Sequence, residues 1–319
     1  MIFRRILLPA FAFLVIWSCK KDDDSSVKVV PPKDLEEVRP IDDSSIEAYL
    51  ETHFYNYSEF ENPAADFDFK IRIDTIAGEN ADKTPLKEMM APVKVPVPVN
   101  RFSGKGEGMI EHTYYYLVAR QGIGQSITVA DSAFVRYEGM LLNGKKFDAS
   151  DKIPVWFDLA SIQGGGARGF AEGTKHLKTG GTPIINEDGT FTVEDYGVGL
   201  VIFPSGLGYY NTTTSGIPAY NPLIFTIDLF AMSQTDHDRD GIPSIMEDLN
   251  RNGYLYDDNT DMEQEIKNKV QIIANFLDAD DDGDGKPTKE EIVIDGEGNI
   301  SFPDTNGNGI PDYLDPATK

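Results

Sequence analysis

The sequence predicts an α+β domain followed by an irregular, strongly acidic module. Several segments alternate apolar and polar residues with the period of two that half-buried strands require. One short segment, 167–181, instead has the apolar spacing of an amphipathic helix and stops at glycines. Packing a single helix against an antiparallel sheet gives the α+β class. The 319 residues are enough for two or three such units.

The first 19 residues, MIFRRILLPAFAFLVIWSC, predict a secretory signal peptide. They contain two arginines, a short apolar run and a small residue before the single cysteine, Cys19, and the run is too short for a membrane-spanning helix. The ending VIWSC resembles a lipobox, which implies that Cys19 is the lipidated first residue of a mature lipoprotein. An ordinary signal peptide with an incidental cysteine is the alternative. With one cysteine, no intrachain disulfide can form.

Residues 20–24, KKDDD, resemble an export tag of some outer-membrane lipoproteins, and a solvated tether is the alternative. The charged stretch 20–43 predicts a flexible linker, because its composition cannot offset the entropy of ordering. Helical spacing predicts a helix from Ser44, and period-two alternation predicts strands at 67–76 and 93–99. The prolines of 93–99 suit an edge strand.

The region 44–111 is an extension for which two roles are open, extending the sheet or forming a dimerising arm. The segment 112–122 is the next predicted strand. Further predicted elements, in order, are a strand at 132–142, a hairpin turn at Asn143-Gly144, a strand at 154–159, the helix at 167–181, and strands at 199–204 and 222–232. The insertion 182–198 predicts an additional hairpin around Asp188-Gly189.

The formal net charge of −24 argues against nucleic acid as a partner, because phosphate binding needs clustered Lys and Arg. Residues 236–319 contain 22 Asp or Glu and 7 Lys or Arg, which leaves −15 of this charge in the last quarter of the chain. Such asymmetry predicts a separate module, either a solvating tail or a cation site.

A repeat in this acidic quarter favours the cation site. The segments 236–247, 280–291 and 304–315 each have oxygen-bearing side chains at positions one, three and five, Gly at six and a carboxylate at twelve. Calcium takes six to eight oxygens, and a tight glycine turn lets alternate side chains converge on one ion. A less regular fourth copy covers 248–261. An amphipathic helix is predicted at 263–277, with Ile266, Val270, Ile273 and Leu277 on its apolar stripe.

Flanking helices are mostly missing, so the repeats resemble thrombospondin type-3-like calcium loops more than EF-hands. The predicted ligands are Asp236, Asp238, Asp240 and Glu247; Asp248, Asn250, Asn252, Asp258 and Asp261; Asp280, Asp282, Asp284 and Glu291; and Asp304, Asn306, Asn308, Asp312 and Asp315. Which of them share an ion is left open by the sequence. Because extracytoplasmic calcium is plentiful, the ion is expected to be structural.

Five blocks in the middle of the chain carry a second resemblance. VRYEGMLLNGKKFDAS, PVWFDL, RGFAEGTKHLKTGG, FPSGLGYY and GIPAYNPLIFTIDLF follow one another in order. They resemble the signature blocks of FKBP-type peptidyl-prolyl cis–trans isomerases over residues 112–231. The resemblance implies an antiparallel half-barrel sheet around one short helix, with a shallow apolar pocket between them. It implies proline-containing polypeptides as substrates and no cofactor for catalysis.

The resemblance also implies which residues form the pocket. Its walls would be Tyr137, Phe147, Val155, Phe170, Tyr209, Ile217 and Phe225, with Phe170 as the floor. Asp148 would hold the shape of the site and face the substrate carbonyl. The Tyr209 hydroxyl and the Ala167 backbone N–H would bind substrate carbonyls.

Several positions depart from the family pattern. Gly166 and Ala167 stand where larger aliphatics are preferred, Val155 where Phe is common, and Phe170 where the floor is often Trp. These changes imply a roomier, less apolar pocket and a weak isomerase.

The predicted organisation is a signal peptide (1–19), a linker (20–43), an extension (44–111), an isomerase domain (112–232) and calcium repeats (233–319). The leading hypothesis is a lipid-anchored isomerase at the outer membrane, on its periplasmic or cell-surface side, that assists folding of exported proteins. A non-catalytic FKBP-like binding module is the main alternative. A calcium-stiffened surface adhesin or glycan-handling accessory is supported only by the repeats and the export tag.

Overall fold

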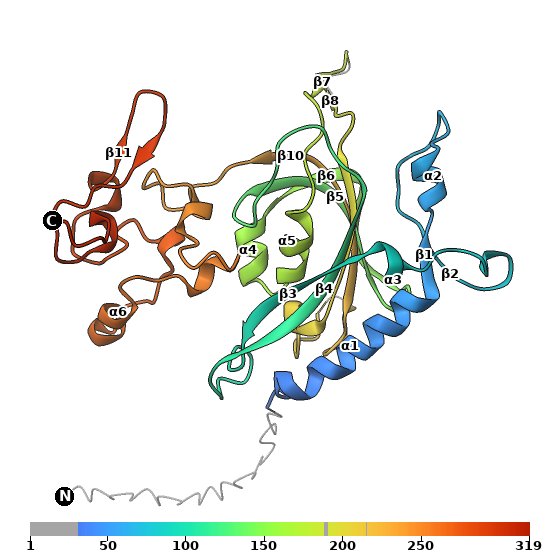
Figure 1. Cartoon of the computed structure of the whole chain (residues 1–319), viewed down its shortest axis with the longest axis horizontal. Coiled ribbons are helices and arrows are strands. Elements are labelled where there is room, and N and C mark those ends of the chain that lie inside the picture. The colour runs from blue at the N-terminus through green and yellow to red at the C-terminus, as the bar shows by residue number, and fades with distance from the viewer. Residues whose placement is uncertain (1–30, 188–190, 215) are drawn as a thin grey trace, which may run out of the picture. The chain divides into compact units, whose positions relative to one another are not determined.

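A six-stranded antiparallel sheet is the centre of the fold (Figure 1). The structure, a computed structural model, describes residues 31–187, 191–214 and 216–319. The strands lie in the order β3-β4-β9-β10-β5-β6. Their bounds are β3 Ala91–Pro98, β4 Met109–Arg120, β5 Ser132–Leu141, β6 Lys146–Asp158, β9 Gly197–Phe203 and β10 Leu223–Ser233. The predicted α+β class is confirmed.

Strand β9 shows why both faces of this sheet are covered. All seven of its residues are buried. Val201 and Phe203 belong to one hydrophobic core. Leu200 and Ile202, which alternate with them along the strand, belong to a second core on the other face. Successive side chains of a strand alternate between faces, so a strand with no polar position must be covered on both.

Two short helices cover the first face, on which the predicted pocket lies. They are α4 Leu159–Gly164, which the sequence analysis missed, and α5 Arg168–Thr174, which is shorter than the predicted helix (Figure 1). Asp158 caps α4 by accepting hydrogen bonds from the backbone N–H groups of Ala160 and Ser161. The short 3₁₀ helix η2, Ser205–Leu207, follows β9.

The opposite face is covered by the later part of α1, Leu35–Thr52, which begins well before the predicted helix (Figure 1). Leu35 and Val38 at the start of α1 belong to the first core. The predicted linker boundary at residue 43 is therefore wrong. Leu35, Val38, Ile46 and Leu50 recur at helical spacing and are buried, so the apolar stripe runs through Pro40. The signal peptide, Cys19 and the linker up to residue 30 lie outside the described residues.

The extension 44–111 extends the sheet, because its strand β3 pairs with β4. The predicted strand at 67–76 is mostly wrong, since only β2, Ile73–Thr75, is a strand and it pairs with β1, His53–Tyr55. The other short elements here are α2 Tyr57–Glu61, η1 Gly78–Asn80 and α3 Leu86–Met89.

The insertion forms a hairpin, as predicted, from β7, Ile184–Ile185, and β8, Phe191–Thr192. Its predicted turn, Asp188-Gly189, lies outside the described residues. The apolar side chains of Ile184, Ile185 and Phe191 are at least half exposed.

The C-terminal module consists of loops separated by single turns. Its elements are η3 Ser244–Glu247, η4 Leu255–Asp257, α6 Met262–Asn268, η5 Asn275–Leu277, η6 Thr288–Glu290, β11 Val293–Ile294, β12 Ile300–Ser301 and η7 Asp312–Leu314. The predicted helix at 263–277 is wrong beyond Asn268, because Lys269 takes a left-handed conformation and ends α6. Ile266, Val270 and Leu277 are exposed, so no apolar stripe packs.

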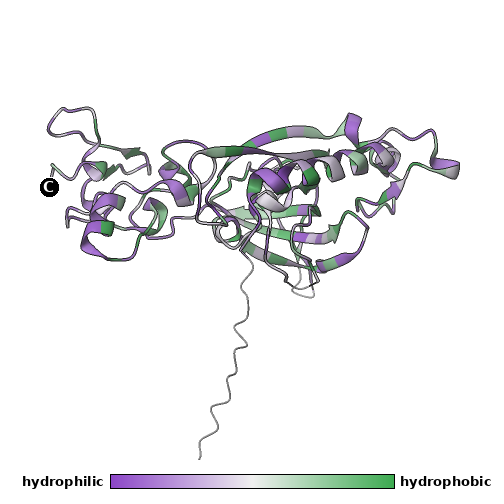
Figure 2. Cartoon of the chain, turned by 90° about the horizontal axis from the view of Figure 1, so that it is seen from below, coloured by the Kyte–Doolittle hydropathy of each residue, from purple (hydrophilic) through white to green (hydrophobic). Residues whose placement is uncertain are grey.

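Hydrophilic stretches alternate with short hydrophobic ones along these loops (Figure 2). Their apolar residues form two small cores instead of one large one. The first contains Leu255 and Phe276 together with Ala130 and Ala160 of the sheet region, and the second contains Ile242, Ile292 and Tyr313. Among the described residues, no helix combines the length and apolarity needed to cross a membrane.

Candidate functional site: an aromatic cavity and acidic loops

One cavity lies where the residues of the predicted pocket meet, on the sheet face covered by α4 and α5. Its volume is about 120 Å³. The residues lining it are Tyr137, Phe147, Asp148, Phe157, Ile162, Ala167, Phe170, Tyr209, Thr214, Ile217 and Phe225. Every predicted pocket residue except Val155 is among them.

Helix α5 places Phe170 at the centre of the aromatic contacts. The Phe170 ring centroid lies 6.1 Å from that of Tyr137, 5.7 Å from Phe157 and 5.2 Å from Phe225, with interplanar angles of 80°, 87° and 79°. Edge-to-face contacts of this kind are favoured by the ring quadrupoles. A Cβ added at neighbouring Gly169 would overlap the Phe203 ring, so this glycine lets α5 approach the sheet.

Asp148 is held by its neighbours. The Tyr137 hydroxyl donates to its Oδ2 at 2.7 Å, and the backbone N–H of Ala149 donates to Oδ1 at 2.9 Å. Burial, together with the hydrogen bond to Asp148, raises the pKa of Tyr137, so its hydroxyl keeps the proton that it donates. The carboxylate thereby fixes the Tyr137 ring in the cavity wall.

The Tyr209 hydroxyl is a polar group that the cavity leaves available. Burial and the charge of Asp148 raise the pKa of Tyr209, which keeps its hydroxyl neutral. In the described part of the chain, this hydroxyl has no hydrogen-bond partner. It can therefore donate to a carbonyl that enters the cavity.

Phe157 takes the place that the sequence analysis gave to Val155. Val135 pairs with Val155, but Tyr137, two residues later, pairs with Ser150, so β6 holds extra residues between the two pairs. Beyond this irregularity, the Phe157 ring lies 5.2 Å from the Tyr137 ring. The order of sequence blocks gives no sign of a bulge. Ile162 and Thr214 also line the cavity and were not predicted, because Ile162 lies on the unpredicted helix α4 and Thr214 lies in a loop.

The predicted role of the Ala167 backbone N–H is wrong. This N–H donates to the carbonyl of Ile162 at 3.1 Å and closes the end of α4. Gly166, with φ of +102°, makes the turn that this bond requires. The Ala167 side chain still lines the cavity, but its backbone donor is already used.

The cavity suits binding more than covalent chemistry. Among the described residues that line it, Asp148 is the only carboxylate, and none is Ser, Cys, His or Lys. Both oxygens of Asp148 already accept hydrogen bonds. The arrangement therefore offers apolar walls and the hydroxyls of Tyr209 and Thr214.

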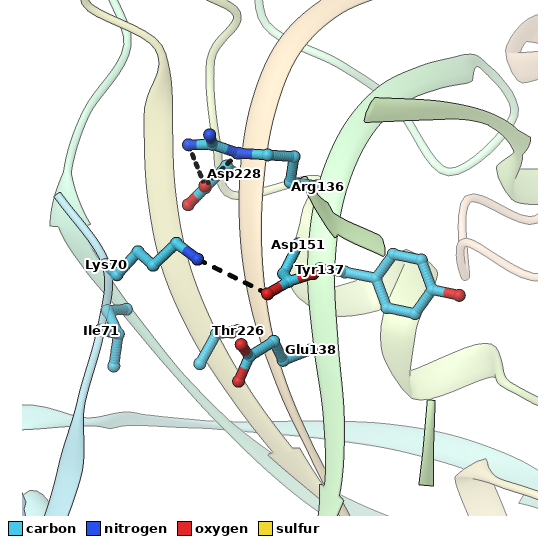
Figure 3. A pocket seen from close by; sticks show the side chains of 8 residues that line it. All are labelled: Lys70, Ile71, Arg136, Tyr137, Glu138, Asp151, Thr226 and Asp228. Carbon is cyan, nitrogen blue, oxygen red and sulfur yellow. Dashed lines mark hydrogen bonds and ion pairs between the residues drawn. The ribbon is translucent and has the colours of Figure 1, made fainter. Parts of the chain in front are cut away.

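A smaller cavity of about 30 Å³ is lined by residues of the opposite sheet face and by Lys70 and Ile71 of the extension (Figure 3). Its charges are paired, with Arg136 and Asp228 at 2.8 Å and Lys70 and Asp151 at 3.8 Å. The Tyr137 ring points away from this cavity in Figure 3, as alternation along β5 requires. The Lys70–Asp151 pair connects the extension to β6, whereas the Arg136–Asp228 pair joins β5 to β10 within the sheet.

Helix α4 has the aromatic cavity on one side and the C-terminal module on the other. Ile162 lines the cavity, while Ala160 packs with Leu255 and Phe276. The Gln163 side chain donates to the carbonyl of Gly253 at 2.7 Å. The loop 248–261 therefore supports a wall of the cavity from behind.

The acidic loops share one hydrogen-bonding pattern. In Asp238, Asp240, Asp282 and Asp284, one carboxylate oxygen accepts a backbone N–H two residues ahead. The other oxygen of each of these side chains is buried and has no hydrogen-bond partner. Further buried carboxylate oxygens without a hydrogen bond belong to Asp258, Asp280, Glu247 and Glu291, of which Glu291 Oε1 lies 3.6 Å from the Lys286 Nζ. Such oxygens are the ligands that Ca²⁺ prefers.

The structure groups the predicted ligands differently from the sequence repeat. Four sets have ligand atoms within 4.8 Å of one another: Asp236, Asp238 and Asp240; Asp240, Glu247 and Asp281; Asp261, Glu265 and Asp278; and Asp280, Asp282 and Asp284. Asp281, Glu265 and Asp278 were not predicted, because they occupy no ligand position of the repeat. Burial raises the pKa of Glu247 to about 10, since ionised carboxylates are unfavourable there without a cation.

The other predicted ligands bond mainly to one another. The Asn250 side chain donates to Asp258 at 3.0 Å, and Asp248 accepts the backbone N–H of Asn252 at 3.0 Å. In the last loop, Asn306 and Asn308 each donate to Asp315 at 2.8 Å. Asp304 accepts three backbone N–H groups of its own loop, and Asp312 accepts from Thr305. These two loops are thus closed by internal hydrogen bonds.

Comparison with known proteins finds an isomerase family over the segment that contains the cavity. The family model for FKBP-type peptidyl-prolyl cis-trans isomerase matches residues 124–230, and a second model, BamM C-terminal, matches residues 237–302. The isomerase FkpA of Buchnera aphidicola subsp. Baizongia pistaciae is 34% identical over 116 residues, which are 36% of this chain and 38% of that protein. FkpA of Escherichia coli K12 is 32% identical over 116 residues, which are 36% of each chain.

The crystal structure of FkpA from Escherichia coli aligns with 38% of this chain and 48% of that chain, at 27% identity and a TM-score of 0.30. The matches thus span less than half the length of these relatives. Within the matched segment lie all the residues that line the aromatic cavity. Residues 124–230 of this chain are therefore a domain of the FKBP-type peptidyl-prolyl cis–trans isomerase family.

Proposed function

We propose that this protein is a peptidyl-prolyl cis–trans isomerase that acts on exported polypeptides. The observation that carries the proposal is the aromatic cavity, in which Asp148 fixes Tyr137 while the Tyr209 hydroxyl stays free. The cavity lies in the segment that matches the isomerase family.

The reaction needs no nucleophile, acid or metal. Rotation about an X–Pro bond faces a barrier of roughly 18–20 kcal/mol, set by amide resonance. A pocket that binds the twisted amide more tightly than the planar one lowers this barrier. Phe170 and Phe225 would hold the proline ring, and Tyr209 would donate to a substrate carbonyl. A dry aromatic surrounding favours the twisted amide, which has lost resonance and much of its charge separation.

We expect this activity to be weak. Gly166 and Ala167 provide little side chain beside the cavity, and the Ala167 N–H is already bonded to Ile162. Of the two donors that the resemblance implied, only Tyr209 is therefore free to bind the substrate.

A protease-coupled isomerisation assay on residues 20–319 tests the proposal. Wild type should accelerate a Leu-Pro or Phe-Pro peptide, and Phe147→Ala and Asp148→Leu should each lower kcat/KM by about tenfold or more. Phe191→Ala, which removes an exposed aromatic ring of the hairpin, is the control and should match wild type. A flat trace from well-folded wild type would reject isomerase activity.

A non-catalytic binding module is the second candidate. The exposed apolar side chains of the β7–β8 hairpin and Trp156 favour it, because a surface of this kind can hold a polypeptide. In that case the same peptide would bind the cavity without faster isomerisation, and Phe147→Ala would weaken its binding.

We further propose that Cys19 is lipidated and anchors the protein at the outer membrane. The lipobox-like ending of residues 1–19 supports the anchor, and the match to BamM C-terminal supports the outer membrane. Cells fed an alkyne-tagged fatty acid should label the wild-type protein but not Cys19→Ser, with Ser18→Ala as control. Equal labelling of Cys19→Ser would reject the anchor.

The acidic loops are proposed to bind Ca²⁺ as a structural ion, with the sequence-predicted carboxylates as ligands. Buried, unpartnered oxygens on Asp238, Asp282 and Asp284 support this proposal. Removing calcium should increase protease cleavage within 236–319 and change the circular dichroism. If both stay unchanged, the structural role is wrong.

A further inference from the structure

Three buried carboxylates from two different loops meet in the C-terminal module. Asp240 and Glu247 belong to the 236–247 loop, and Asp281 belongs to the 280–291 loop. A ligand oxygen of each lies within 4.8 Å of the others. Each of the three side chains belongs to a residue that is 1% exposed.

Most of the oxygens in this group lack a partner. Asp240 Oδ1 accepts the N–H of Ile242, and Asp281 Oδ2 accepts the Thr288 hydroxyl at 2.9 Å. Asp240 Oδ2, Asp281 Oδ1 and both oxygens of Glu247 are buried without a hydrogen bond. The loops thus fix the orientation of Asp240 and Asp281 through one oxygen and leave the other directed into the group.

No positive side chain compensates this group. Across the described ranges, no Lys, Arg or His forms an ion pair with Asp240, Glu247 or Asp281. Burying even one unpaired charge is unfavourable, and like charges in contact add to that cost. Three ionised carboxylates in one buried group therefore require a cation.

We propose that one Ca²⁺ ion bridges these two loops, held by Asp240, Glu247 and Asp281. The proposal rests on the calcium binding proposed above and adds a ligand, Asp281, that lies outside the repeat pattern. Glu247 would bind through both oxygens, which together with Asp240 and Asp281 gives four carboxylate oxygens. Calcium accepts this crowded anionic set, whereas magnesium needs near-octahedral geometry and retains water.

The bridge has a structural consequence. It joins residues on either side of the segment 248–279, and that segment contacts α4 through Gly253. The small core of Ile242, Ile292 and Tyr313 contains a residue from the 236–247 loop, Ile242, and a residue at the end of the 280–291 loop, Ile292. The ion thus holds together loops that share little apolar surface.

Native mass spectrometry of residues 20–319 in calcium tests the bridge, because it counts bound ions and shows in the same spectrum whether the chain is folded. Asp281→Asn retains an oxygen for Thr288 but loses one charge, so the loop should keep its fold. We expect Asp281→Asn and Glu247→Gln each to bind one ion fewer than wild type. The double variant should also bind only one fewer.

Glu290→Gln is the control, since it removes one charge from an exposed side chain of the same loop and should keep every ion. If Asp281→Asn binds as many ions as this control while Glu247→Gln loses one, the ion belongs to the first loop alone and the bridge is wrong. If the double variant loses two ions, the carboxylates serve separate sites and the bridge is also wrong. Wild type without any bound calcium would overturn the calcium proposal itself, whatever the isomerase assay shows.

Discussion

Asp148 supports the site without taking part in the proposed reaction. Its two oxygens are occupied by Tyr137 and by the backbone of Ala149, so it positions the cavity wall. Phe147 contributes its ring to the cavity, and the neighbouring carboxylate of Asp148 holds the Tyr137 ring.

Changing Tyr137 to Phe tests this positioning role. The variant removes the hydroxyl that binds Asp148, whose exposed carboxylate can then be hydrated. We expect the free energy of unfolding to fall by about 0.5–1.5 kcal/mol and kcat/KM to fall severalfold, because the Tyr137 ring is no longer held in place. Urea denaturation and the peptide assay measure both, with Tyr116→Phe as control. Unchanged kcat/KM would show that the bond does not shape the cavity.

Asp42 predicts a pH dependence of stability. It is buried in α1 and accepts hydrogen bonds from the Ser205 backbone N–H at 2.8 Å and hydroxyl at 2.6 Å. Burial raises its pKa to about 6. Because the folded state holds this proton more tightly than the unfolded one, the contribution of Asp42 is full below about pH 4 and is lost as pH rises through 6.

Asp42→Asn, which resembles the protonated acid, should therefore be more stable than wild type near pH 8, by roughly 1–3 kcal/mol. The difference should vanish near pH 4. Urea unfolding at both pH values measures it. A variant that is less stable than wild type at pH 8 would show that the ionised form of Asp42 is the stabilising one.

Most cavity residues could be predicted from the sequence blocks, because the aromatic residues and the order of the blocks can be read from the sequence alone. Phe157 was missed because a strand bulge changes the pairing without changing composition. Asp281 was missed for another reason: its role arises from contact between two loops far apart in the chain.

Helix α4 contacts both the aromatic cavity and the C-terminal module. Ile162 lines the cavity, and Gln163, fully buried, donates to Gly253 of the C-terminal module. Helix α4 could not be predicted from the sequence, because its six residues end in a glycine and show less than two turns of periodicity.

Gln163→Ala should loosen α4 while leaving the cavity residues in place. We expect the loss of about 1 kcal/mol of stability and a severalfold lower kcat/KM, mainly through kcat, because substrate contacts remain. Gln234→Ala, an exposed position, is the matched control. Equal kcat in the two variants would mean that α4 needs no support from Gly253.

Element boundaries were predicted well where periodicity was unbroken and poorly where local signals conflicted. Strands β4, β5, β9 and β10 follow the predicted ranges within a few residues. The start of helix α1 was missed because the charged composition of 20–43 predicted a linker, whereas Leu35 and Val38 in that stretch are buried. The predicted helix at 263–277 had periodicity but no surface to pack on, so its second half is not helical.

The whole molecule combines a hydrophobic domain with a module held by charge and hydrogen bonds. The module's cores contain only a few buried apolar residues each, too few to order so many loops by burial alone. Its order should therefore depend on calcium, while the six-stranded sheet should not.

Calcium removal should therefore also lower the isomerase activity. Chelation should loosen Leu255 and Phe276, which pack against Ala160 of α4, and should lower the isomerisation rate severalfold without unfolding the sheet. Re-added calcium should restore the rate, whereas magnesium should not. A rate that is insensitive to chelation, with the module visibly cleaved by protease, would show that the cavity works without the module.

The most direct test of the central claim is an NMR exchange measurement on a proline-containing peptide with catalytic amounts of wild-type protein. It observes binding and cis–trans exchange in one sample, without a coupling protease. We predict that exchange becomes faster than the uncatalysed process, which takes tens of seconds or longer, and that Phe147→Ala removes the acceleration. Peptide that binds to the wild-type cavity while its exchange rate stays uncatalysed would contradict the isomerase and establish a binding module.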